Sequence, residues 1–302
     1  MNLVKRFLNA VPALGMLNIP PETLIRRYAN DQDKYFFYGG MKIRYRDEGD
    51  GPVLVLLHGV CAFLETWDGW VSVLKKHFRL VRLDVPGFGI TGPAPDKSYY
   101  VREKFVRVMD GLITELGLRH FSIVGNSLGG YFAWNYALDY PEKVNKMILI
   151  DTVGYNQKMP FLLTFASNPL VRPIARFAMP RFMLYTAVKQ VYGNKSRVMR
   201  ENQERYFEYA MRTGNKGSYV DIFAEMKRQN KNPDLARDIP NIRVPTLVMW
   251  GTKDEWVPYR YFDSWKKDLP SARFIAYEGA GHVPMEEVPE QTAADALAFL
   301  KK

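Results

Sequence analysis

The chain has 302 residues, 47% of them hydrophobic, and a formal net charge of +10. This length accommodates one large α/β domain with an insertion, or two domains. The single cysteine, Cys61, excludes an internal disulfide framework. Four scattered histidines give no clustered metal-ligand spacing, so we predict no metal site.

The positive charge is concentrated in one segment. Residues 155–240 contain 15 Lys and Arg against 7 Asp and Glu, which places +8 of the +10 there. The basic residues are dispersed rather than clustered in runs, so a solvated basic face is favoured and no nucleic-acid partner is predicted. Contact with anionic lipid surfaces is also compatible with this charge.

The first 33 residues precede any strand pattern. Lys5 and Arg6 are followed by an apolar run that ends at Leu17 and is interrupted by polar, proline and glycine residues. The run is shorter than the ~20 residues that a membrane span needs, and no clear cleavage site follows it. We expect a helical or extended segment on the protein's own surface, with peripheral membrane contact as the alternative. We accordingly predict a cytoplasmic protein, with or without membrane association, as a monomer or a homodimer.

Strand and helix patterns alternate from Lys34 onward. Two β-prone runs around Gly39-Gly40 indicate a hairpin. Continuous apolar runs at 53–57 and 78–83 are typical of strands buried on both faces of a parallel sheet. Helical spacing is expected at 66–76 and 99–118. This alternation favours an α/β fold with a mostly parallel sheet flanked by helices.

Two of these strands end in polar loop residues. His58-Gly59-Val60 follows the first apolar run, where Gly59 lets the chain double back and leaves the Val60 N–H free to point into a site. Asp84 opens a tight turn rich in Pro and Gly. For both polar side chains we favour a bracing role over a catalytic one: His58 holds its loop by hydrogen bonds, and Asp84 ties down the turn.

Residues 121–130 read as a strand, a sharp turn and the start of a helix, with Ser127 at the apex. A serine hydroxyl is a poor nucleophile unless it is exposed and a base can take its proton. A sharp turn brings neighbouring backbone very close, so glycine is needed at Gly125 and Gly129. The N–H of Leu128 then lies at a helix N-terminus, where it can face a developing negative charge.

After the serine, a buried strand at 144–150 ends at Asp151, and the strand pattern then stops until 246–250. The intervening residues are rich in aromatics and show helical stretches at 181–192, 196–213 and 218–229. We interpret 154–240 as a helical cap inserted into the sheet domain. Strands at 246–250 and 273–277 are followed by Asp254 and His282, and a closing helix is expected at 289–300.

Over roughly residues 34–302, the chain resembles an α/β-hydrolase of the capped esterase and lipase type. Four motifs carry the resemblance: His58-Gly59, Asp84-x-Pro86-Gly87-x-Gly89, Gly125-Asn126-Ser127-Leu128-Gly129-Gly130, and Trp250-Gly251-x-x-Asp254 with Gly281-His282. Their order, Ser…Asp…His, matches that of the family. The serine motif is similar to that of bacterial lipolytic enzymes related to the meta-cleavage hydrolases. The resemblance implies a core of residues 34–153 and 241–302 carrying a cap of residues 154–240.

The resemblance also implies the site. Ser127 is the expected nucleophile, His282 the base that takes its proton, and Asp254 the acid that orients the imidazole. The backbone N–H groups of Val60 and Leu128 are the expected oxyanion hole. This cycle needs no cofactor.

Asp151 is a rival for the acid, because it also ends a strand and some relatives place the acid there. We favour Asp254.

The predicted activity is hydrolysis of a small-molecule carboxylic ester through an acyl-serine. Met159, Met179 and Met183, with the cap aromatics, suggest an apolar acyl or aryl group. Hydrolysis of a carbon–carbon bond in a diketone is the alternative on the same residues, and a ligand-binding member without turnover is a third. A thioesterase or peptidase is less favoured. A Ser rather than an Asp nucleophile argues against haloalkane dehalogenase and ordinary epoxide hydrolase chemistry.

Overall fold

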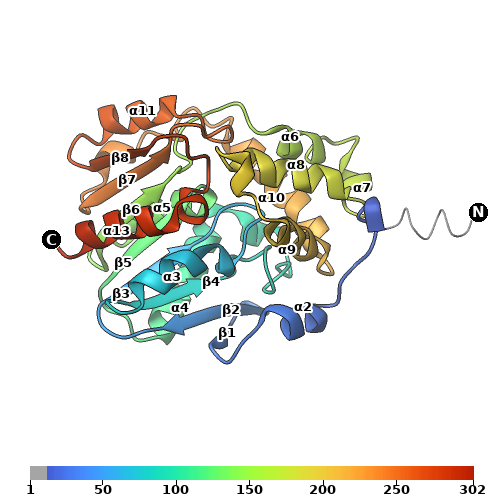
Figure 1. Cartoon of the computed structure of the whole chain (residues 1–302), viewed down its shortest axis with the longest axis horizontal. Coiled ribbons are helices and arrows are strands. Elements are labelled where there is room, and N and C mark those ends of the chain that lie inside the picture. The colour runs from blue at the N-terminus through green and yellow to red at the C-terminus, as the bar shows by residue number, and fades with distance from the viewer. Residues whose placement is uncertain (1–11) are drawn as a thin grey trace, which may run out of the picture.

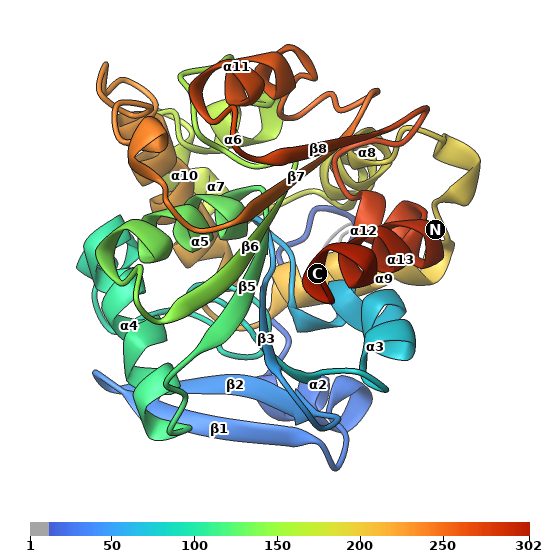
Figure 2. The same cartoon turned by 90° about the vertical axis from the view of Figure 1, so that its left-hand side faces the viewer.

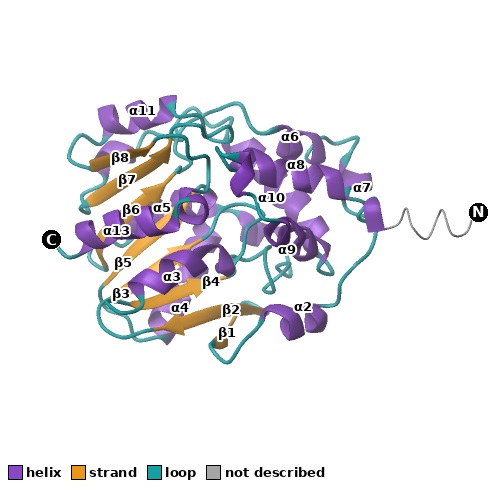
Figure 3. Ribbon diagram, in the orientation of Figure 1, coloured by secondary structure: helices purple, strands orange, loops and turns teal. Residues whose placement is uncertain are grey.

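The structure, a computed structural model, describes residues 12–302 and is built around an eight-stranded sheet in the order β1-β2-β4-β3-β5-β6-β7-β8 (Figure 3). The β1–β2 and β2–β4 pairs are antiparallel, and the other pairs are parallel. The strands are β1 (Asp33–Tyr38), β2 (Met41–Glu48), β3 (Val53–Leu57), β4 (Arg79–Leu83), β5 (Phe121–Asn126), β6 (Val144–Ile150), β7 (Thr246–Gly251) and β8 (Arg273–Tyr277). The predicted mostly parallel sheet is confirmed.

Helices cover both faces of this sheet. Figure 2 shows α4 and α5 on one face and α3 and α13 on the other. The flanking helices are α3 (Asp68–Leu74), α4 (Arg102–Glu115), α5 (Leu128–Asp139), α11 (Arg260–Asp268), α12 (Pro284–Glu287) and α13 (Pro289–Leu300), with α2 (Pro21–Tyr28) ahead of β1. The central strands are buried along most of their length because both of their faces are covered, which explains their largely apolar sequences. Across residues 12–302, no helix is long and apolar enough to cross a membrane.

Residues 154–240, hereafter the helical segment, leave the sheet after β6 and return before β7. They lie beyond the carboxyl ends of the parallel strands (Figure 1). Their helices are α6 (Phe161–Ala166), α7 (Arg172–Ala175), α8 (Arg181–Val191), α9 (Arg200–Met211) and α10 (Asn215–Gln229), with a 3-10 helix (Lys195–Arg197) between α8 and α9. The division of the chain into core and cap at residues 153 and 240 stays a prediction.

The predicted elements differ from the structure mainly where proline occurs. Helices α6 and α7 were not expected, yet Pro160 immediately precedes α6 and Pro173 lies in the first turn of α7. Proline lacks an N–H but fits the first turn of a helix, so here it begins helices rather than preventing them. The helix expected at 196–213 is shorter and begins at Arg200, and α10 begins three residues before the expected 218.

Candidate active site

Ser127 lies at the apex of the turn between β5 and α5. Its φ of 55° is in the left-handed region that non-glycine residues rarely adopt, and such strain is typical of functional positions. A Cβ on Gly125 would lie 2.3 Å from the carbonyl oxygen of Gly129, and one on Gly129 would lie 2.3 Å from that of Leu57. The predicted need for both glycines is therefore confirmed. The turn presents Ser127 at the carboxyl edge of the sheet.

His282 and Asp254 are joined by a buried hydrogen bond beside this turn. His282 Nδ1 is 2.7 Å from Asp254 Oδ2, while Asp254 Oδ1 accepts hydrogen bonds from the backbone N–H groups of Trp256 (2.7 Å) and Val257 (2.9 Å). His282 Nε2 has no hydrogen-bond partner among residues 12–302. The imidazole is thus held at one nitrogen and left free at the other, the state that a general base needs.

The rival carboxyl group, Asp151, occupies a different position. Its Oδ1 accepts a 2.9 Å hydrogen bond from the Gly251 N–H, and no hydrogen bond joins it to His282 within the described part of the chain. Burial, and then the neighbouring Asp254 carboxylate, raise the pKa of Asp151 well above its usual range. This shift favours the uncharged form of the Asp151 carboxyl group. The carboxyl group that is hydrogen-bonded to the His282 imidazole is therefore that of Asp254.

Asp151, Asp254 and His282 also bring one potential metal-ligand atom each to within 4.8 Å of one another. The linear spacing of these residues gave no sign of such a cluster. Asp254 and His282 are already hydrogen-bonded to each other, and the raised pKa of Asp151 disfavours the charged form that a metal ion would need. The prediction of no metal site stays a prediction.

Hydrogen bonds between segments fix the loop that carries His282. The Asn126 side-chain amide donates to the His282 carbonyl at 3.0 Å, and the His282 N–H donates to the Val191 carbonyl of α8 at 2.7 Å. The buried Glu287 carboxylate accepts from the N–H groups of Gly193 (2.9 Å) and Gly281 (2.8 Å). Sequence analysis missed the role of Glu287, because its partner at the end of α8 lies about 90 residues away.

The two predicted oxyanion donors, Val60 and Leu128, come from backbone next to Ser127. Neither the Val60 nor the Leu128 N–H donates a hydrogen bond to another residue of the described chain. A Cβ on Gly59 would lie 3.1 Å from Ser127 Cβ, so the backbone before Val60 passes directly against the serine. Leu128 is the first residue of α5, where helix N–H groups are unpaired and the helix dipole is positive.

His58 and Asp84 brace this region as predicted. His58 Nδ1 is 2.8 Å from the Gly59 carbonyl oxygen, and its Nε2 accepts from the Val85 N–H at 2.9 Å. Burial lowers the pKa of His58 to about 4, which keeps it neutral. Asp84 accepts N–H hydrogen bonds at 2.8 Å from Leu64 and Ile90. Neither side chain contacts Ser127 through a hydrogen bond.

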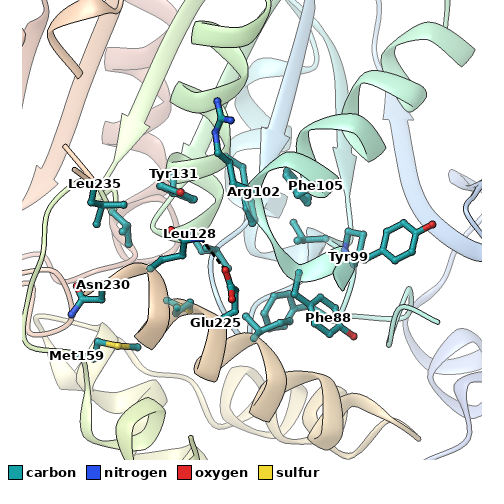
Figure 4. Close-up of a pocket in the computed structure, with 18 of the residues that line it drawn as sticks. Phe88, Tyr99, Arg102, Phe105, Leu128, Tyr131, Met159, Glu225, Asn230 and Leu235 are labelled. Atoms are coloured by element: carbon teal, nitrogen blue, oxygen red, sulfur yellow. Dashed lines mark hydrogen bonds between the residues drawn. The ribbon is translucent and has the colours of Figure 1, made fainter. Parts of the chain in front are cut away.

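Two cavities adjoin Ser127 through its neighbours in sequence. The first includes Leu128 and lies between α4, α5 and α10, with Phe88, Tyr131 and Met159 in its wall (Figure 4). The second includes Asn126 and His282 and extends beneath α8, where Leu184 and Val188 line it. Both walls are mostly apolar. Their only cationic side chain of Lys or Arg type within residues 12–302 is Arg102.

The sequence matches the family described as alpha/beta hydrolase fold over residues 52–289. The chain belongs to the α/β-hydrolase family. It is 27% identical over 285 residues to 2-hydroxy-6-oxo-6-(2'-aminophenyl)hexa-2,4-dienoic acid hydrolase of Metapseudomonas resinovorans, covering 89% of this chain and 91% of that one. It is also 30% identical to lipase 3 of Moraxella sp. strain TA144, covering 84% and 78% of the two chains.

Among solved structures, the crystal structure of a membrane phospholipase A is similar, with a TM-score of 0.76 and 26% identity. That similarity covers 99% of this chain and 97% of the other. The relatives therefore span more than one class of hydrolase. They identify this protein as a hydrolase of the α/β fold and leave its substrate to be argued from the site.

A half-buried acid, Glu286, predicts a pH-dependent stability of this hydrolase. Its carboxylate accepts from Tyr192 Oη at 3.0 Å and from Tyr206 Oη at 3.3 Å, and Tyr206 lines the second cavity. Burial raises the pKa of Glu286 from 4.5 to about 7, against the lowering effect of the two phenols. The folded state thus binds this proton more tightly than the unfolded chain does. The unfolding free energy should fall as pH rises from about 4.5 to 7, by about 3 kcal/mol from this group.

Urea denaturation of wild type and Glu286→Gln at pH 5 and pH 8 measures this effect. The variant should lack that fall and should therefore gain stability relative to wild type at pH 8. Glu290→Gln, on the exposed side of α13, is the matched control and should follow wild type. Parallel pH profiles for wild type and Glu286→Gln would contradict the prediction.

Proposed function

We propose that this protein is a serine hydrolase that cleaves carboxylic esters of apolar acyl or aryl groups through an acyl-serine intermediate. The observation that carries the proposal is the Asp254–His282 pair, whose second imidazole nitrogen is unpaired in a cavity beside the strained Ser127. A nucleophile, a base and an acid that orients the base are the elements of acyl transfer through serine.

The proposed cycle uses only groups of this chain and water. Ser127 Oγ attacks the ester carbonyl carbon while His282 Nε2 takes the hydroxyl proton, and Asp254 stabilises the resulting imidazolium. The Val60 and Leu128 N–H groups bind the oxyanion. His282 then gives the proton to the departing alkoxide, which leaves as the alcohol. Water, activated by the same imidazole, hydrolyses the acyl-serine and restores the Ser127 hydroxyl.

The character of the two cavities supports an apolar ester rather than an anionic substrate. The second cavity has no Lys, Arg, Asp or Glu in its wall. In the first, Arg102 is already engaged, because it donates to Asn135 Oδ1 and to Asp139 Oδ1, both at 2.6 Å. A substrate carboxylate placed in either cavity would lose its hydration without gaining a free cationic partner, which is strongly unfavourable.

Carbon–carbon bond hydrolysis is the second candidate function, and the similarity to the hydrolase of a dienoic acid favours it. It would use the same Ser127 and His282. The named substrate of that relative carries a carboxylic acid, so its binding here would need a cationic side chain freed from Asp139. For this reason we rank ester hydrolysis first.

Comparing turnover of p-nitrophenyl esters of increasing acyl length with turnover of a vinylogous diketone acid separates the two functions. We expect kcat/KM for the best ester to exceed that for the diketone by about 100-fold or more, because desolvating an unpaired carboxylate opposes binding of the diketone. Higher kcat/KM for the diketone would reverse the order of the two proposals. Turnover of neither class would favour a ligand-binding protein without catalysis.

A further inference from the structure

The large apolar side chains that are exposed to solvent are concentrated in two stretches of the chain. Of the eleven that are exposed within residues 12–302, ten fall in two stretches, 14–17 and 161–199, and the eleventh is Phe37 on β1. Within the two stretches, the most exposed are Leu170 (87%), Phe177 (72%), and Phe161 and Phe182 (69% each). Single exposed apolar residues are ordinary, but a concentration of this kind marks an interaction surface.

The two stretches lie at the same end of the molecule. Figure 1 shows α6, α7 and α8 beside the segment that precedes α2, at the end opposite the C-terminus. The Met179 N–H donates to the Gly15 carbonyl oxygen at 3.4 Å, and Lys216 Nζ donates to the Leu17 carbonyl oxygen at 2.7 Å. We name the exposed apolar side chains of 14–17 and 161–182 the apolar end face.

The chain segment that carries most of the apolar end face contains no acidic residue, although Asp221 of α10 and Glu204 of α9 pair with two of its arginines. Residues 152–200 contain eight Lys and Arg and no Asp or Glu, and the first acid of the chain is Glu22. Lys158 and Lys189 are exposed and form no ion pair with any residue of 12–302. Lys189 lies seven residues after Phe182 in α8, so both project from the same side of that helix.

We propose that the apolar end face docks on a lipid bilayer with anionic headgroups. Exposed aromatic and aliphatic side chains bury themselves at the boundary between headgroups and acyl chains, and flanking Lys and Arg side chains bind the anionic headgroups. An acid-free basic segment of 49 residues surrounding an apolar patch complements such a surface in both respects. This proposal concerns where the protein acts and does not rest on ester hydrolysis.

Sedimentation with vesicles tests this proposal on the full chain carrying Ser127→Ala, so that lipid hydrolysis cannot alter the vesicles. This parent protein, with no other substitution, should bind strongly to phosphatidylglycerol vesicles and more weakly to phosphatidylcholine vesicles. The triple variant Leu170→Ser, Ile174→Ser and Phe177→Ser should lower the partition coefficient ~100-fold, since each side chain loses apolar burial. Phe37→Ser is the matched control, because Phe37 is as exposed as Phe177 and lies on β1. It should bind like the parent.

The charge contribution is tested separately. Lys158→Glu with Lys189→Glu should weaken binding to phosphatidylglycerol vesicles by a factor on the order of 30 and leave binding to phosphatidylcholine nearly unchanged. Sedimentation velocity of the same variants identifies the competing occupant, a second copy of the chain. Failure of the parent protein to bind anionic vesicles would overturn the proposal. So would dissociation of a dimer by the triple variant with vesicle binding retained.

Discussion

Ser127→Ala should lower kcat/KM for the best p-nitrophenyl ester by on the order of 10⁴-fold or more, because no other group can form the acyl intermediate. The expected residual rate comes from the oxyanion donors and substrate binding alone. The protein should remain folded, since the substitution removes one buried hydroxyl that forms no hydrogen bond with another side chain in the described chain. Circular dichroism and thermal unfolding check that point.

Ser122→Ala provides the matched control for this prediction. Ser122 lies on the same strand, β5, five residues before the turn and outside both cavities. Its replacement should leave kcat/KM within about twofold, as is usual for substitutions away from a site. Retention of ester turnover by Ser127→Ala would remove the serine from the mechanism and with it the proposed function.

Asp254→Asn should have the second largest effect, a loss on the order of 10⁴ in kcat. An amide at this position would donate to His282 Nδ1 and thereby hold the imidazole in the wrong tautomer. Substrate binding involves neither oxygen of Asp254, so KM should change little. The kcat of this variant should stay low at every pH between 5 and 9, because His282 is no longer oriented as a base.

Asp151→Asn is the informative partner to that variant. Burial raises the pKa of Asp151 and so favours its uncharged form, which an amide matches in charge and shape. Its kcat should therefore stay within about tenfold of wild type. A severe loss in Asp151→Asn together with near-normal activity in Asp254→Asn would move the role of acid to Asp151.

The sheet was largely predictable because burial on both faces leaves a direct trace in the sequence. The continuous apolar run at 53–57 coincides with β3, and the strands predicted at 144–150 and 273–277 coincide with β6 and β8. The turn at Ser127 was predictable for a related reason. Gly125 and Gly129 are each forced by backbone that approaches where a Cβ would lie, and such positions admit only glycine.

Other features depend on long-range contacts that local sequence patterns do not reveal. The aromatic residues of the helical segment gave one uniform pattern, yet Tyr209 and Tyr219 are fully buried whereas Phe177 and Phe182 are exposed. The hydrophobic character of a residue alone does not distinguish a core residue from an exposed surface residue. Likewise, the raised pKa of Asp151 follows from its burial beside Asp254, which lies 103 residues further along the chain.

Covalent labelling of the wild-type protein by a fluorophosphonate, followed by mass spectrometry of its peptides, tests the central claim most directly. A serine activated by His282 should attack the phosphorus rapidly, and the adduct should map to Ser127. Labelling should be absent in Ser127→Ala and strongly slowed in Asp254→Asn. An unlabelled wild-type protein, or an adduct on any residue other than Ser127, would contradict the account.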